Sequence, residues 1–158
     1  MAKVKLDRID RKILNDLQEN GRMTNVELAE RAGISAPPCL RRVRALEEAG
    51  VIKGYHADID PVSLGYGVSV FAQVGLAHQS EHDQKKFEDL VRSWPQVREC
   101  YLVSGEADYI LKIVAEDWGA YQAFLTQHLS SAPNVSHIKS ALGVRVAKYK
   151  PGVPVDIE

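Results

Sequence analysis

The chain has 158 residues, of which 45% are hydrophobic, and a net charge of −1, which excludes a polycation that coats nucleic acid without selection. No apolar run approaches the roughly 18 residues of a membrane-spanning helix, and no secretory signal opens the sequence. Cys39 and Cys100 are far apart, which indicates a reducing, cytoplasmic environment and not a disulfide framework. The length accommodates one average domain or two small ones.

Apolar residues recur at helical spacing between residues 6 and 17, which predicts a first helix. Asp7 stands near the start of this helix and Gly21 follows its end. Thr24 and Glu27 have the spacing of a capping box, which predicts the start of a second helix. The apolar face of the second helix is expected at Val26, Leu28, Ala29 and Ala32.

A third helix is predicted after Gly33, because glycine readily takes the left-handed conformation that ends a helix. Ser35 is a suitable N-cap, prolines fill the first turn, and Gly50 ends the helix. Its buried stripe is expected at Leu40, Val43 and Leu46. The second and third helices, joined by a tight turn, make a helix-turn-helix. The β-prone residues 51–55 are expected to extend it as a short wing or strand.

Positive charge is concentrated on this helix-turn-helix. Residues 31–53 contain five basic and two acidic side chains, whereas residues 61–158 contain nine basic and eleven acidic ones. The planar guanidinium of arginine bonds bidentately to phosphates and guanine edges, so the third helix is predicted to enter the major groove with its N-terminal half. The residues predicted to contact DNA are Ser35, Ala36, Pro38, Arg41, Arg42 and Arg44. We expect Arg41 or Arg42 to reach bases and the other arginines to hold phosphates; an ordinary solvated helix face is the alternative.

Proline and glycine cluster at residues 61–67, the expected linker between a DNA-binding domain at residues 1–60 and a second domain at residues 68–158. Ser80 and Asp117 are the expected N-caps of two helices in the second domain. Its predicted strands cover residues 68–76, 97–103, 109–114 and 135–149. The order of elements is the ferredoxin-like βαββαβ pattern, so the fold class is α+β. Such a sheet carries helices on one face only, and another subunit is the simplest cover for the other.

Two other classes of function are weighed against DNA binding. The sequence lacks hydrolase, dinucleotide, P-loop and metalloprotease signatures, and Glu106 with Asp108 fits a turn or a ligand contact, so no enzyme is predicted. His78 and His82 have a spacing that suits zinc on a helix. They stand on either side of the expected N-cap Ser80 and would not share a helical face. No metal site is therefore predicted.

Several short motifs follow one another through both halves of the chain. They are Leu6-Asp7-Arg8-Ile9-Asp10-Arg11 with Ile13-Leu14, Asn25-Val26-Glu27-Leu28, Pro38-Cys39-Leu40 with Arg42-Val43-Arg44 and Leu46-Glu47, Gly54-Tyr55, Glu99-Cys100 with Leu102-Val103-Ser104-Gly105, and Asp108-Tyr109. In these motifs the chain resembles the Lrp/AsnC family, the feast/famine regulators, over residues 6–148. Ala36, Pro37 and Arg41 depart from the expected pattern, so the DNA site is expected to differ from that of similar proteins.

The resemblance implies a transcriptional regulator with a winged helix-turn-helix head, a linker and a ferredoxin-like domain that binds an amino-acid effector, leucine or another. It also implies homodimers that assemble into tetramers or octamers on palindromic sites in double-stranded DNA. No cofactor besides the effector and no membrane partner are expected. An architectural protein that compacts DNA without a ligand is the alternative, and a ligand-dependent change in DNA affinity would separate the two.

The turn at residues 104–108 is the expected effector pocket. Gly105 lets a ligand approach the backbone closely, and Asp108 offers a carboxylate to an ammonium group. Turn geometry alone also explains these residue types, but the resemblance implies a ligand at this loop, between adjacent dimers. The predicted lining is Tyr101, Leu102, Val103, Ser104, Gly105, Glu106 and Asp108, completed by Ser136, Ile138 and Ser140 from a neighbouring subunit.

Overall fold

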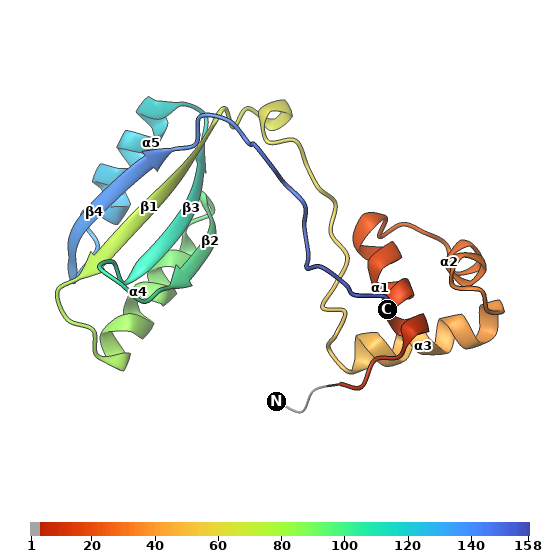
Figure 1. Ribbon diagram of the computed structural model, residues 1–158. Helices are drawn as coiled ribbons and strands as arrows, with labels where there is room; N and C mark the ends of the chain where they lie inside the picture. Colours follow the sequence, from red (N-terminus) through yellow and green to blue (C-terminus); the bar gives the residue numbers. More distant parts are fainter. Residues whose placement is uncertain (1–3) are drawn as a thin grey trace. The chain divides into compact units, whose positions relative to one another are not determined.

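The computed structural model describes residues 4–158, and the chain divides into two compact units (Figure 1). The first unit extends to Asp58 and also takes in Lys148–Glu158, while the second unit is Ile59–Ala147. The sequence pattern predicts that all of residues 68–158 belong to the second domain. The structure instead groups residues 148–158 with the first unit, because they bond to its first helix.

The described part of the first unit contains three helices. They are α1 (Arg8–Glu19), α2 (Asn25–Ala32) and α3 (Ala36–Glu48). Asp7 caps α1 and Thr24 caps α2, in capping boxes completed by Asp10 and Glu27. Gly33 ends α2 with a φ of 75°, as predicted. The three helices enclose a core of Ile13, Leu28, Ala29, Ala32, Cys39 and Leu46.

The buried faces of α2 and α3 differ from the prediction. Val26 is 67% exposed and Leu40 is 38% exposed, whereas Cys39 is fully buried. Cys39 and Leu46 lie about 20° apart around the helix axis, while Leu40 and Leu46 lie about 120° apart. The row of α3 that faces the core therefore starts at Cys39, and the prediction of Leu40 as a core residue was wrong.

The predicted wing does not form a strand, since described residues 51–59 contain neither helix nor strand. The N–H groups of Val51 and Ile52 both donate to the carbonyl of Leu46, at 3.0 and 3.1 Å, which turns the chain back at the end of α3. Both side chains pack against the helical core. The expected linker contains a short 3₁₀ turn, Val62–Leu64.

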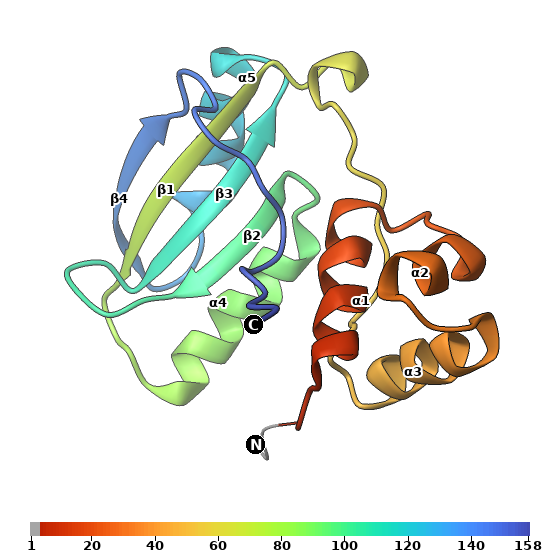
Figure 2. The same ribbon diagram turned by 45° about the vertical axis from the view of Figure 1, so that its right-hand side comes forward.

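The second unit is built on a four-stranded antiparallel sheet with the order β2-β3-β1-β4. The strands are β1 (Val68–Leu76), β2 (Val97–Leu102), β3 (Tyr109–Ala115) and β4 (Val135–Leu142). One face is covered by α4 (Glu81–Ser93) and by α5 (Trp118–Phe124), which continues into a π-helical turn at Leu125–Leu129 (Figures 1 and 2). Ser80 and Asp117 cap the two helices. The α+β class and the ferredoxin-like order are confirmed.

The last strand is shorter than the sequence pattern predicted, because β4 ends at Leu142. Its neighbour β1 begins at Val68, and the N–H of Gly143 donates to the carbonyl of Ser69 at 2.8 Å. Only Val68 of β1 lies beyond this point, so β4 has almost no strand left with which to pair. The chain therefore leaves the sheet, and the side chain of Val144 is 90% exposed.

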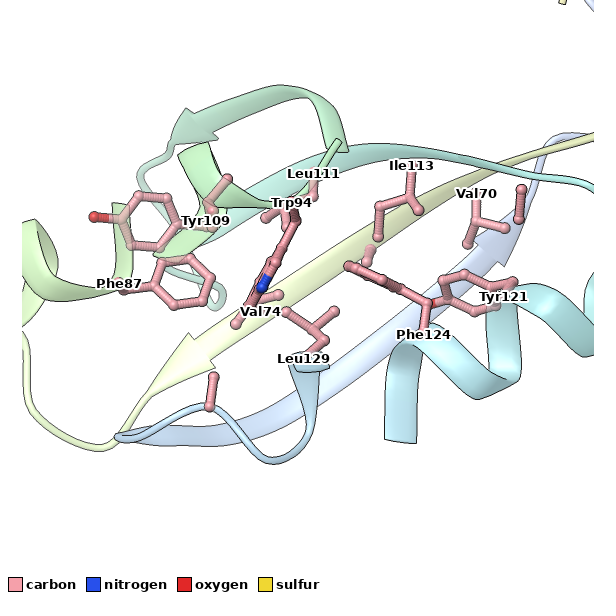
Figure 3. Close-up of a cluster of buried hydrophobic side chains, with 14 of the residues drawn as sticks. Val70, Val74, Phe87, Trp94, Tyr109, Leu111, Ile113, Tyr121, Phe124 and Leu129 are labelled. Atoms are coloured by element: carbon pink, nitrogen blue, oxygen red, sulfur yellow. The ribbon is translucent and has the colours of Figure 1, made fainter. Parts of the chain in front are cut away.

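The core of the second unit lies between the sheet and its helices (Figure 3). Alternate residues of β1 and β3 point into this core, namely Val70, Ala72, Val74, Tyr109, Leu111 and Ile113. The helices add aromatic side chains, and the rings of Trp94 and Phe124 meet edge to face with centroids 5.6 Å apart. The remaining side chains of each strand therefore point to the side of the sheet opposite the helices.

The opposite side of the sheet, here called the uncovered face, has no helix of the second unit, Ile59–Ala147, against it (Figure 1). Strand register places Phe71 opposite Lys112 and Gln73 opposite Ile110, and residues opposite one another point to the same side of a sheet. The uncovered face includes Phe71, Gln73, Glu99, Tyr101, Ile110, Lys112, Lys139 and Ala141. Its aromatic members are well exposed, Phe71 at 45% and Tyr101 at 59%.

Candidate DNA interface and effector site

The arginines of α3 fall into two groups. Arg41 and Arg44 are exposed on the outer surface of the helix. Arg42 turns toward α1, where its Nη1 donates to Asp7 Oδ2 at 2.7 Å and to Asp10 Oδ1 at 2.8 Å. The carboxylates of Asp10 and Asp7 raise the pKa of Arg42. The backbone N–H of Asp10 and the guanidinium together lower the pKa of Asp7.

Arg42 thus joins α3 to α1. Its side chain is 32% exposed and that of Asp10 is 16% exposed, so solvent screens this pair only in part. The two acidic partners lie 32 and 35 residues away in the chain, too far for sequence spacing to indicate the contact. The position of Arg42 around the helix axis could have indicated that it faces α1. Arg42 lies about 60° from Cys39 around the axis, at the rim of the buried face.

Two prolines at the start of α3 change what its N-cap can do. A capping serine accepts from the N–H of the second or third helical residue, and here these residues are Pro37 and Pro38, which have no N–H. The side chain of Ser35 accordingly makes no capping bond to this fully described helix. The hydroxyl of Ser35 is exposed and can bond to another molecule. The next residue, Ala36, is half-buried.

Asn25 joins α2 to the start of α3, a contact that residue type and spacing do not predict. Its Nδ2 donates to the carbonyl of Ala36 at 2.9 Å. Its Oδ1 is buried and has no hydrogen-bond partner among the described residues, so the donor alone holds the amide in place. The angle between the two helices of the helix-turn-helix is thus supported by a side-chain contact as well as by the core.

An open hollow of about 650 Å³ lies beside the loop that joins β2 to β3. It is lined by Gln73, Leu102, Val103, Ser104, Glu106, Ala107 and Ile110. Gly105 in this loop has a φ of 124°, and no described atom lies within 4 Å of the place where a Cβ would stand. Four predicted residues are brought together here: Leu102, Val103, Ser104 and Glu106. Gln73 and Ile110 were missed because they meet only through the register of β1 with β3, which this sequence does not reveal.

Asp108 is not among the described residues that line this hollow. Its Oδ2 accepts the N–H of Leu76 at 2.6 Å, and its own N–H donates to the carbonyl of Val74 at 3.0 Å. The carboxylate therefore fastens the end of β1 to the loop. Tyr101 also points elsewhere, since its hydroxyl donates to Glu99 Oε2 at 3.1 Å on the uncovered face.

The residues expected from a neighbouring subunit are engaged within their own. Ser140 shares a hydrogen bond with the hydroxyl of Tyr121, and Ile138 packs against the core. Ser136 Oγ donates to the carbonyl of Gly75 at 3.0 Å. Alternate residues of a strand share a face, so these three side chains lie on the helix side of β4. The structure does not support the place predicted for them.

Other reactive groups offer little further chemistry. Burial raises the pKa of the Cys39 thiol, and burial together with Glu88 raises that of Cys100 to about 11, so both thiols are neutral near pH 7. Among residues 4–158, no group of three His, Cys, Asp or Glu side chains is arranged to hold a metal ion. Nor is any helix in this described range long and apolar enough to cross a bilayer.

Both units match known domain families. Residues 6–53 match the winged helix-turn-helix DNA-binding family, and residues 69–153 match the Lrp/AsnC ligand binding domain. The chain belongs to the Lrp/AsnC family. The resemblance seen in the sequence is confirmed, and the Lrp/AsnC chain is a transcriptional regulator with a DNA-binding head and a ligand-binding domain.

Named relatives of this Lrp/AsnC chain are regulators, not enzymes. It is 52% identical to the leucine-responsive regulatory protein of Rhizobium meliloti, over 94% of its own length and 95% of the relative's. It is 43% identical to the Bkd operon transcriptional regulator of Pseudomonas aeruginosa, over 95% and 98% of the two chains. A solved transcriptional regulator from Neisseria meningitidis, in complex with L-Met, superposes with a TM-score of 0.92 at 38% identity, over 96% and 98% of the two chains.

Proposed function

We propose that this Lrp/AsnC chain regulates transcription in response to an amino acid with an apolar side chain, bound in the hollow beside residues 104–107. The observation that carries the proposal is the lining of that hollow, in which apolar walls meet the exposed carboxylate of Glu106. Two relatives support this chemistry, since one is named leucine-responsive and another was solved with L-Met.

The ammonium group, the carboxylate and the side chain of such a ligand each have a complementary group in the hollow. Glu106 pairs with the ammonium group in place of Asp108, whose carboxylate is engaged by Leu76. Backbone N–H groups beside Gly105 donate to the ligand carboxylate, and Leu102 with Ile110 contacts its side chain. A hydrogen bond to a charged group contributes about 1.5–3 kcal/mol and each buried CH₂ about 0.8 kcal/mol. Leucine or methionine should therefore bind more tightly than alanine.

For the DNA contact we assign the exposed Arg41 and Arg44 together with Ser35, Ala36 and Pro38 at the start of α3. Ser35 is the N-cap residue of α3, and Ala36, Pro38 and Arg41 lie on its N-terminal half, the part that meets base edges in helix-turn-helix proteins. Arg44 lies about one turn further along the helix, where it would hold a phosphate. Arg42, held by the acidic residues of α1, supports the helix from behind.

The uncovered face is the proposed surface for a second copy of the chain. Beyond its exposed aromatic residues, it carries a second hollow of about 640 Å³ that shares Gln73 and Ile110 with the effector hollow. A two-fold homodimer through this face would present two recognition helices to a palindromic site. Tetramers or octamers of such dimers would bring several effector hollows into one assembly.

The effector assignment is tested by calorimetry with leucine, methionine, alanine and lysine, followed by DNA binding with each ligand that gives heat. We expect Glu106→Gln to weaken leucine or methionine binding by about tenfold or more, through loss of a charge-assisted bond. Glu116→Gln is the matched control, an exposed glutamate that follows β3 and does not line the hollow. Unchanged affinity in Glu106→Gln, or no binding of any apolar amino acid, would contradict the proposal.

A further inference from the structure

The tail segment, Lys148–Glu158, returns to the first unit and bonds to α1 (Figure 1). Gln18 makes a two-point contact with the backbone of Val153, since its Nε2 donates to the carbonyl at 2.9 Å and its Oε1 accepts the N–H at 2.8 Å. Arg11 Nη1 donates to the carbonyl of Asp156 at 3.1 Å. Near the other end of α1, Lys150 lies 3.9 Å from a carboxylate oxygen of Glu19.

The spacing of these contacts shows that the tail segment is extended along one face of α1. Arg11 and Gln18 are about two turns apart, which separates them by about 10 Å along the axis. Three residues of extended chain, from Val153 to Asp156, also span about 10 Å. The tail segment runs antiparallel to α1. The distance from Val153 to Asp156 along the tail is therefore about equal to the distance between their partners, Gln18 and Arg11, along the helix.

The sequence of the tail segment suits this docked conformation. Gly152 has a φ of 85°, which favours glycine, and a Cβ at this position would stand 2.0 Å from Gln18 Oε1, so it would displace the Gln18 amide from its contact. Pro151 and Pro154 flank the contact and restrict the backbone before docking, which lowers the entropy lost on ordering. Neither proline removes the N–H that is used, because that N–H belongs to Val153.

We propose that the tail segment is a working part of the DNA-binding unit, which it fastens by docking on the outer face of α1. The inference rests on the DNA-binding role of the first unit. It follows from a chain of contacts in which the tail segment holds Arg11 and Gln18, while Asp7 and Asp10 of the same helix hold Arg42 of α3. Fixing α1 therefore limits the movement of the recognition helix.

Docking also gives the DNA-binding unit a second attachment to the regulatory unit, through non-covalent contacts of a tail segment that is covalently continuous with β4. One connection enters β1 at Val68, and the other leaves β4 at Leu142. Val70 pairs with Leu142, so both connections start from the same end of neighbouring strands. The tail segment is thus continuous with β4, and the DNA-binding unit is held at two points of its sequence instead of one.

The test compares Gly152→Ala and Gln18→Ala with Gly65→Ala, in the full chain. Gly65 has a φ of 86° but no described atom within 4 Å of its Cβ position, so its variant carries the backbone strain without the clash. We expect faster hydrogen exchange in α1 and a DNA affinity weakened by about three- to tenfold in the first two variants, the size of one or two lost hydrogen bonds. The double variant should be no worse than either single one, because both remove the same contact.

Wild-type exchange in α1 for Gly152→Ala, or an equal effect in Gly65→Ala, would overturn the proposal. The exchange measurement needs neither DNA nor an amino acid, so its outcome is independent of the proposed effector. Amino-acid affinity should stay unchanged in the tail variants, since Gly152 and Gln18 do not line the described effector hollow.

Discussion

Arg42 and Arg44 lie on the same helix but in different electrostatic surroundings. Arg42 bonds to Asp7 and Asp10 at 2.7 and 2.8 Å, whereas Arg44 is exposed. To reach a phosphate, Arg42 would have to give up both ion pairs, and the released carboxylates would repel the DNA backbone. Residue type alone therefore does not decide which arginine binds nucleic acid.

The salt dependence of DNA binding separates these roles. Arg44→Gln should lower the slope of log affinity against log salt by about 1, because one phosphate contact no longer releases a counterion. Arg42→Gln, the same chemical change two residues earlier, should keep the slope and lower the melting temperature of the first unit. Fluorescence anisotropy over a series of KCl concentrations measures the slopes. An equal loss of slope in both variants would show that Arg42 binds phosphate.

At the scale of single elements, the loop between β2 and β3 is tied to β1 by Asp108. Its carboxylate accepts the N–H of Leu76, a backbone group at the end of a strand. Asp108→Ala should therefore lower the free energy of unfolding by about 1–3 kcal/mol, since the N–H loses its acceptor. Asp108→Asn should cost less because its amide oxygen still accepts. Urea denaturation measures both, and Glu106→Ala, on the exposed side of the loop, should leave stability near wild type.

Sequence could predict the elements whose limits are set locally. The starts of α1 and α2 follow from residues three positions apart, such as Asp7 with Asp10. The end of β4 could not be predicted, because it depends on where β1 begins. For the same reason, only the loop residues of the proposed effector hollow could be predicted, while Gln73 and Ile110 depend on strand register.

At the scale of the whole molecule, the described residues form two separate cores that share no side chain. The fragment Ile59–Ala147 should therefore fold alone with one cooperative transition, and should self-associate through the uncovered face. Thermal unfolding followed by circular dichroism tests the first expectation, and static light scattering tests the second, with the full chain as reference. A monomeric fragment would contradict the proposed dimer surface, and a broad non-cooperative transition would contradict independent folding.

The docking of the tail segment has a consequence for how the protein folds during its synthesis on the ribosome. Gln18 and Arg11 find partners 135 and 145 residues later in the chain, after the entire second unit has been translated. The helices that read DNA thus emerge from the exit tunnel before the second unit, but they receive all their contacts only after it has been translated. If the tail segment fastens α1 as proposed, a nascent chain without it would hold α1 loosely, and we expect full DNA binding only after the regulatory domain has also been made.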